Sequence, residues 1–314
     1  MHVAKNKLVP VALLAAGALT LSACSGPGAD GNDADTLKVV ASTSIWADVA
    51  QAVADSSPDL DVEVQALVEG NDVDPHHFEP TAADLARANE ADVVIANGGG
   101  YDAWMYQALS NQDDIISALP LTDHGALDEE PDVMPAAEAK EHPGEVTNIE
   151  GNEHIWYDAA AIKKVAKETA DRLNELSETK DASADAVAQE AEAIQDKLAS
   201  IGSFRYAQTE PIADYLMKYT PATDATPDGY RKATVAEGEP TAADLARFLG
   251  EVNEDNVDVL IYNPQTETDL TTRIKDAAEG KDLPIVEIGE TPPKDTNFLE
   301  YYEQVVDDLA AASK

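Results

Sequence analysis

The sequence is short of several residue types, and each shortage excludes something. It contains a single cysteine in 314 residues, so no disulfide can form within the chain. Only 21 residues are Lys or Arg against 61 Asp or Glu, which gives a formal net charge of -40. Such a charge repels phosphates, so we exclude nucleic-acid binding, and it also disfavours adsorption to anionic lipid. The charge attracts cations, although an extracytoplasmic protein adapted to salt or acid would have the same composition.

Only one long apolar run is present, and it lies near the N-terminus. Residues 8–21 follow a short basic segment and are too short to span a bilayer as a stable helix, which is typical of a signal peptide. The run ends in Leu21-Ser22-Ala23-Cys24, which resembles a bacterial lipobox, where the cysteine is lipidated. We therefore predict a signal peptide over residues 1–23 and lipid attachment at Cys24, which would anchor the protein on the extracytoplasmic face of the cell membrane. Residues 24–35 are rich in Gly, Asp and Asn and are predicted to form a flexible tether.

Strand-like and helix-like segments alternate along the mature chain. The strand-like runs are residues 37–41, 62–68 and 92–97 in the first half and 258–263 in the second. Alternation of this kind is typical of a parallel α/β sheet. Residues 79–87 read EPTAADLAR, and residues 239–247 repeat all nine letters, each time ahead of a strand-like run. The sequence therefore predicts an α/β fold of two related lobes, each a parallel sheet flanked by helices.

A stretch rich in Ala, Glu, Lys and Gln lies between the two halves. It extends from Asp158 to Ile201 with a break near residues 179–183, which predicts two helices. A second helix of about 18 residues would be about 27 Å long and stiff, so it would resist wide hinge opening between lobes. We predict an N-terminal lobe, a rigid linker helix and a C-terminal lobe at residues 36–182, 183–202 and 203–314.

Histidine is scarce, and the motifs around it carry the functional signal. His76 and His77 lie in DPHHFEP at residues 74–80, after a strand-like run, and His154 lies in NEHIWYD at residues 152–158, before a helix. In α/β proteins, ligands bind beyond the carboxyl ends of the strands. This position makes His76 a candidate metal ligand, with a solvated loop residue as the alternative.

Together the lipobox, DPHHFEP and NEHIWYD resemble the solute-binding lipoproteins of manganese and zinc ABC importers, over essentially the whole mature chain. The resemblance implies that His76 and His154 are metal ligands. It implies a third ligand at the start of the second lobe, where Glu210 lies, and a fourth late in that lobe. The family has an aspartate at the fourth position, and here Glu290 lies closest to it. The alternatives are Glu287, Glu267 and Gln265.

This ligand set predicts one divalent cation, Mn²⁺ or Zn²⁺, bound between the lobes as cargo. Two neutral imidazoles and two carboxylates balance its charge. Mixed nitrogen and oxygen donors suit Zn²⁺, and a larger oxygen share favours Mn²⁺, although Zn²⁺ should bind the same site more tightly. Zinc-binding members of the family carry a His-rich loop, whereas residues 122–153 contain ten acidic residues and only two histidines. We predict that this segment is a solvated acidic loop, with weak collection of cations as the alternative.

The resemblance implies a lipid-anchored, monomeric binding protein that delivers its ion to an ABC permease and the associated ATPase. The sequence contains no HExxH, GxSxG or phosphate-binding glycine loop, so we expect no enzymatic activity. A zinc-dependent surface hydrolase and a cell-surface adhesin are the alternative functions.

Overall fold

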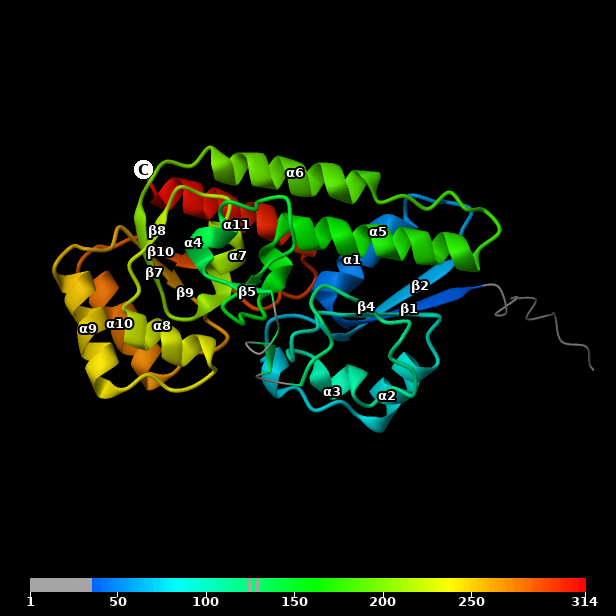
Figure 1. Ribbon diagram of the computed structural model, residues 1–314, viewed down its shortest axis with the longest axis horizontal. Helices are drawn as coiled ribbons and strands as arrows, with labels where there is room; N and C mark the ends of the chain where they lie inside the picture. Colours follow the sequence, from blue (N-terminus) through cyan, green and yellow to red (C-terminus); the bar gives the residue numbers. More distant parts are fainter. Residues whose placement is uncertain (1–35, 124–125, 128–129, 131) are drawn as a thin grey trace, which may run out of the picture. The chain divides into compact units, whose positions relative to one another are not determined.

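The computed structural model describes residues 36–123, 126–127, 130 and 132–314 (Figure 1). The predicted signal peptide, the tether with Cys24, and His124 lie outside these residues. No helix in the described part of the chain combines the length and the apolar character needed to cross a membrane.

The first lobe contains a four-stranded parallel sheet with the order β2-β1-β3-β4. Its strands are β1 (Leu37–Thr43), β2 (Val62–Val68), β3 (Val93–Ala96) and β4 (Ile116–Ser117). The connecting helices are α1 (Ser44–Ala54), α2 (Ala82–Asn89) and α3 (Ala103–Tyr106). All four side chains of β3 are buried, as expected for a parallel strand covered on both faces.

The second lobe has a parallel sheet with the order β10-β9-β7-β8. Its strands are β7 (Arg205–Gln208), β8 (Thr223–Asp224), β9 (Val259–Tyr262) and β10 (Ile285–Glu287), and its helices include α7 (Asp214–Met217), α8 (Asp228–Val235), α9 (Ala242–Asn253) and α10 (Asp269–Glu279). Counted within each lobe, both sheets have the strand order 2-1-3-4. The prediction of two related α/β lobes is therefore confirmed.

The repeated EPTAADLAR segment starts the helix before the third strand of each sheet. In α2, Thr81 accepts from the backbone N–H of Asp84, and the Asp84 carboxylate accepts from the backbone N–H of Thr81. Thr241 and Asp244 make the same capping box at the start of α9. The shared residues thus satisfy the same unpaired helix-start groups in both lobes.

Three helices join the lobes. They are α5 (Ala159–Leu176), α6 (Asp185–Ala199) and α11 (Phe298–Ala312). The predicted linker helix is α6. The C-terminal helix α11, which sequence analysis assigned to the second lobe, packs against α6, β10 and also α1 of the first lobe (Figure 1). The Asp48 carboxylate in α1 accepts from the backbone N–H of Phe298 at 2.7 Å, so α11 begins in direct contact with the first lobe.

One continuous apolar core extends through both lobes. Its buried aromatic side chains come from both lobes and include Trp46, Trp156, Tyr215 and Tyr302. Two smaller cores lie on the outer faces of the sheets, one in each lobe. Each sheet is therefore held between its own outer helices and a core that the two lobes share.

The prediction of a solvated acidic loop holds only in part for residues 132–153, where Asp132, Glu138, Glu141 and Glu145 are exposed but other residues pack. This part forms a two-stranded parallel sheet of β5 (Val133–Met134) and β6 (Asn148–Ile149), with α4 (Ala136–Ala139) between them. The Lys140 ammonium donates to the carbonyls of Thr220 at 3.0 Å and Ala222 at 2.6 Å in the second lobe. Ile149 is fully buried. This packing could not be predicted from the acidic composition, because it depends on only a few lysine and apolar contacts.

Candidate metal centre

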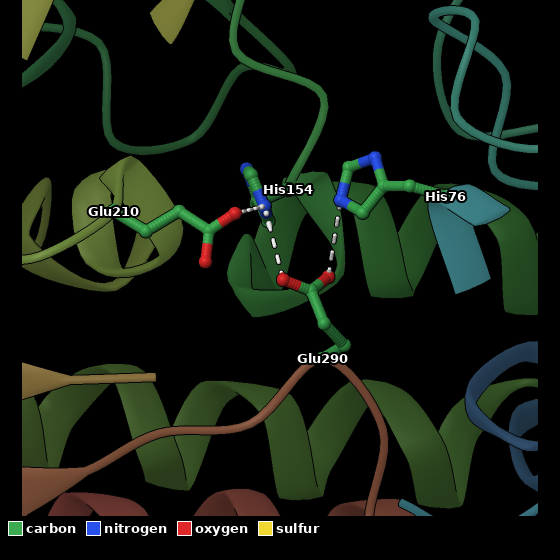
Figure 2. A group of neighbouring side chains, drawn as sticks. All are labelled: His76, His154, Glu210 and Glu290. Atoms are coloured by element: carbon green, nitrogen blue, oxygen red, sulfur yellow. Dashed lines mark ion pairs between the residues drawn. The ribbon is translucent and has the colours of Figure 1, made fainter. Parts of the chain in front are cut away.

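The four predicted ligands, which are distant in the sequence, lie close together in the structure (Figure 2). The ligand atoms of His76, His154, Glu210 and Glu290 all lie within 4.8 Å of one another. His154 Nε2 lies 3.4 Å from Glu290 Oε1 and 3.7 Å from Glu210 Oε1. His76 Nε2 lies 3.7 Å from Glu290 Oε2. Two imidazoles from the first lobe therefore face two carboxylates from the second.

Each of these side chains is placed by a short turn or by a loop after a strand. His76 lies in a 3₁₀ turn, η1 (Pro75–His77), where the Asp74 carboxylate accepts from the backbone N–H of His76 at 2.9 Å. His154 comes directly before η3 (Ile155–Tyr157), and Glu210 directly before η4 (Pro211–Ala213). Glu290 follows the end of β10. After Glu210 the chain continues as η4 followed by the short α7.

The two imidazole rings are oriented by oxygens on the far side from the centre. His76 Nδ1 lies 2.7 Å from Glu153 Oε1, and His154 Nδ1 lies 2.6 Å from Asn152 Oδ1. An oxygen partner keeps a proton on Nδ1 and leaves the Nε2 lone pair for a metal ion. Both Nε2 atoms face Glu290 (Figure 2).

The two carboxylates share one amide. Asn263 Nδ2 donates to Glu210 Oε2 at 2.5 Å and to Glu290 Oε1 at 2.8 Å. Tyr101 donates its hydroxyl to Glu290 Oε2 at 3.2 Å, and Thr266 donates to Glu210 Oε2 at 2.7 Å. Sequence analysis missed these supporting residues. The available signal was that Asn263 directly follows the buried strand β9, at the edge where ligands of parallel sheets bind.

The centre is nearly closed to solvent, and its two histidines and Glu290 shift one another's pKa values strongly. The Glu290 side chain is fully buried, and that of Glu210 is the most open of the four at 17%. Burial lowers the pKa of His154, but the carboxylates of Glu290 and Glu210 outweigh burial and raise it to about 10. The pKa of His76 is likewise raised, against its burial, by Glu153 and Glu290. Burial opposes ionisation of Glu290, but the two histidines hold its pKa well below its ordinary value.

In the metal-free protein, the raised pKa values of His76 and His154 keep both imidazoles protonated at neutral pH, where they face the ionised Glu290. A divalent cation can enter only by displacing protons from Nε2, because a coordinating histidine must be neutral.

The alternatives for the fourth position lie elsewhere. The Glu287 side chain is 54% exposed and pairs with Lys275 at 2.8 Å. Glu267 accepts from the Tyr262 hydroxyl at 2.7 Å. Gln265 bonds to Thr291 through both ends of its amide. Of the three glutamates among the candidates, only Glu290 lies in the cluster with both histidines.

The second histidine of DPHHFEP does not join the cluster. The His77 side chain is 85% exposed, with Nδ1 at 3.3 Å from Asp74 Oδ2. Its neighbour His76 lines a cavity of about 690 Å³, and the wall of that cavity includes Glu237 and Glu239 of the second lobe. The centre is thus reached through an acidic opening.

A family model covers nearly the whole described chain. The model for the periplasmic component A of zinc-uptake complexes, ZnuA, matches residues 39–312. The chain belongs to this family.

Named relatives of the chain are substrate-binding lipoproteins of metal ABC transporters. The chain is 28% identical over 232 residues to the iron ABC transporter substrate-binding lipoprotein MtsA of Streptococcus pyogenes, covering 66% of this chain and 70% of MtsA. It is 33% identical over 110 residues to the manganese ABC transporter substrate-binding lipoprotein PsaA of Streptococcus pneumoniae, covering 34% of each chain.

Solved structures agree on the fold. The laminin-binding protein Lmb of Streptococcus agalactiae, described as an adhesin with metal-transporting activity, matches with a TM-score of 0.63 at 18% identity over 88% of this chain and 100% of its own. A crystal structure of ZnuA matches with a TM-score of 0.61 at 19% identity, over 89% of this chain and 100% of that one.

These relatives are substrate-binding components of ABC transporters and not enzymes. The prediction that the chain is a solute-binding protein of a metal ABC importer, rather than a hydrolase, is confirmed. The adhesin alternative is not better supported, because the family model and the named relatives are those of transport proteins.

Proposed function

We propose that His76, His154, Glu210 and Glu290 ligate one divalent cation, Mn²⁺ or Zn²⁺, which the chain carries as cargo between its lobes. The observation that carries this proposal is the convergence of their ligand atoms within 4.8 Å of one another. Two neutral imidazoles and two carboxylates neutralise a dication, and each ligand has a hydrogen-bonding partner that orients it. Such supporting contacts are a general property of metal sites.

The donor set bears on the choice of metal. Nitrogen and oxygen donors in equal number accept Zn²⁺, and two carboxylates favour Mn²⁺ more than a three-histidine set would. The affinity order of divalent metals still ranks Zn²⁺ above Mn²⁺ at one and the same site. We infer that Mn²⁺ is carried where Zn²⁺ is scarce, and that Zn²⁺ competes with it directly.

The test is calorimetric titration of both metals into the metal-free protein. A stoichiometry of one ion per chain, with Zn²⁺ and Mn²⁺ competing for that ion, is expected. Two independent ions, or no binding by either metal, would contradict the proposal. We expect a monomer, which light scattering tests; one chain supplies all four proposed ligands, so the site needs no second copy.

We also infer that Cys24 carries a lipid anchor and that the loaded protein delivers its ion to an ABC permease and ATPase on the extracytoplasmic side of the membrane. The lipobox at residues 21–24 and the lipoprotein names of the relatives support this. Cys24→Ser should release the protein from the membrane or leave it uncleaved. Tight membrane association of a processed Cys24→Ser protein would contradict the anchor.

A further inference from the structure

The side chain of Asn152 uses every hydrogen-bonding position that it has. Its Oδ1 accepts from the backbone N–H of His154 at 2.9 Å and lies 2.6 Å from Nδ1 of the same residue. Its Nδ2 donates to the carbonyl of Pro211 at 2.6 Å and to Asp214 Oδ2 at 2.9 Å. Because those two acceptors require the NH₂ group, Oδ1 must face His154, and His154 Nδ1 must be the donor.

These contacts cross between the lobes beside two of the proposed ligands. Asn152 and His154 belong to the first lobe, whereas Pro211 follows Glu210 directly in the second. The backbone carbonyl of Asn152 also accepts from the Tyr215 hydroxyl of the second lobe at 2.6 Å. One buried asparagine therefore contacts a ligand of the first lobe and the residue next to a ligand of the second.

The second-lobe side of this contact is itself held firmly. The Asp214 side chain is fully buried and accepts from Arg231 through both oxygens, at 2.8 and 2.9 Å. It also accepts from Gln208 Nε2 at 2.6 Å. Arg231 reaches back to Glu150 Oε2 at 2.9 Å, two residues before Asn152. Asp214 is thus a fixed acceptor that sets the position of the Asn152 amide.

We propose that Asn152, held by Asp214, is a positioning residue through which contact between the lobes orients His154 and slows release of the ion. When the lobes are in contact, Oδ1 fixes the His154 ring with Nε2 toward Glu290. When they separate at this point, the amide loses both acceptors and the ring is free to turn. The proposal rests on the proposed role of His154 as a ligand.

The experiment compares purified wild-type protein with Asn152→Ala, and Asn148→Ala serves as the matched control. Asn148 lies four residues upstream, is also buried, and bonds through both ends of its amide, to the Leu127 carbonyl and the Gly151 N–H, without contacting His154. Release of Zn²⁺ to a chelator should be about 10- to 100-fold faster in Asn152→Ala, because loss of a partner of a metal ligand usually costs about 10- to 100-fold in affinity and affinity losses fall mainly on the release rate. The release rate of Asn148→Ala should be within about twofold of the wild-type rate, because Asn148 bonds to none of the proposed ligands.

A second readout separates positioning from simple destabilisation. In the Zn²⁺-loaded wild type, both ligand histidines should show an exchange-protected Nδ1 proton by NMR. Asn152→Ala should lose one of these two signals, and Asn148→Ala should keep both. Asn152→Asp places a carboxylate against Asp214 and should also speed release, whereas Asn152→Asp combined with Asp214→Asn restores a donor–acceptor pair and should recover part of the loss.

Wild-type protein that binds no metal would refute the proposed function, not this inference. If wild type binds but Asn152→Ala releases Zn²⁺ at the wild-type rate, or keeps both protected protons, Asn152 is not a positioning residue. Equal acceleration in Asn148→Ala would reduce the effect to general destabilisation and would also overturn the proposal.

Discussion

Metal binding should depend steeply on pH, because the metal-free centre holds protons that the ion must displace. The carboxylates that face His154 raise its pKa to about 10, and the pKa of His76 is also raised well above its ordinary value. Glu290 stays ionised throughout this range, since its pKa is lowered. Each bound ion should therefore release up to two protons at neutral pH. One displaced proton changes the apparent affinity about tenfold per pH unit.

The expected magnitude follows directly. Between pH 6 and pH 8, displacement of the His154 proton alone should raise the apparent affinity about 100-fold, and displacement from His76 as well should raise it up to about 10,000-fold. Calorimetry in two buffers with different ionisation enthalpies counts the released protons, and titrations at several pH values give the slope. A flat affinity between pH 6.5 and 9, or a proton count near zero, would refute the charge coupling of the centre.

The same coupling predicts how stability changes without metal. A histidine whose folded pKa lies above its unfolded value of about 6.5 stabilises the fold fully below that value and loses this contribution as pH rises through the folded pKa. For His154 the loss should extend from about pH 6.5 to about pH 10. The melting temperature of metal-free protein should fall over this window, and the stabilisation by added metal should grow.

Three further predictions concern single residues. His76→Ala should abolish most of the metal-induced rise in melting temperature, which reflects about 4 kcal/mol of binding at a thousandfold excess of metal over Kd. His77 is exposed, so His77→Ala should leave that rise nearly intact, and equal losses in the two variants would mean that both histidines coordinate. Glu210→His should weaken Mn²⁺ binding more than Zn²⁺ binding in calorimetry, because imidazole suits zinc, and Glu210→Ala should weaken the binding of both metals. A gain in Mn²⁺ affinity in Glu210→His would exclude Glu210 as a ligand. Lys218→Met should cost about 3–5 kcal/mol in denaturant unfolding, because the buried Asp158 loses its charged partner at 3.0 Å and keeps only neutral hydrogen-bond donors. A loss below about 1 kcal/mol would contradict the importance of this buried ion pair.

Much of the fold was predictable because local signals and global topology agree in this chain. Strand-like runs and a repeated helix start were sufficient to predict two related parallel sheets. The placement of α11 was not predictable, since its amphipathic pattern shows that one face is buried but not which lobe covers it. The packing of residues 132–153 was hidden in the same way, because their composition is polar although Ile149 is buried and Lys140 bonds to the other lobe.

The candidate site was predictable to the extent that its residues lie in motifs. His76 and His154 are surrounded by Asp-Pro and aromatic neighbours that mark them in the sequence. Glu290 was the weakest of the four choices, because the family has an aspartate at the fourth position and this chain has none there, with Glu287 as a nearby alternative. Only the tertiary structure separates the two: one is fully buried beside both histidines, and the other is 54% exposed.

The supporting residues could not be predicted at all, because hydrogen-bond partners such as Asn263 depend on distances between segments far apart in the chain. Asn263 bonds to Glu210 and Glu290, which lie 53 and 27 residues away.

The way in which the lobes are joined limits how the ion can leave. Wide separation of the lobes would expose the shared apolar core to water, which is unfavourable. It would also separate the buried charges of Lys218 and Asp158, which is unfavourable as well. Release does not require such opening. At the proposed site a Zn–N bond would be about 2.0–2.1 Å long, so a displacement of about 1 Å between Glu290 and the two histidines would already break coordination. A stiff frame with ligands divided between two lobes therefore combines tight holding with release by a small movement, and the reprotonation of His76 and His154 that follows would favour the empty state.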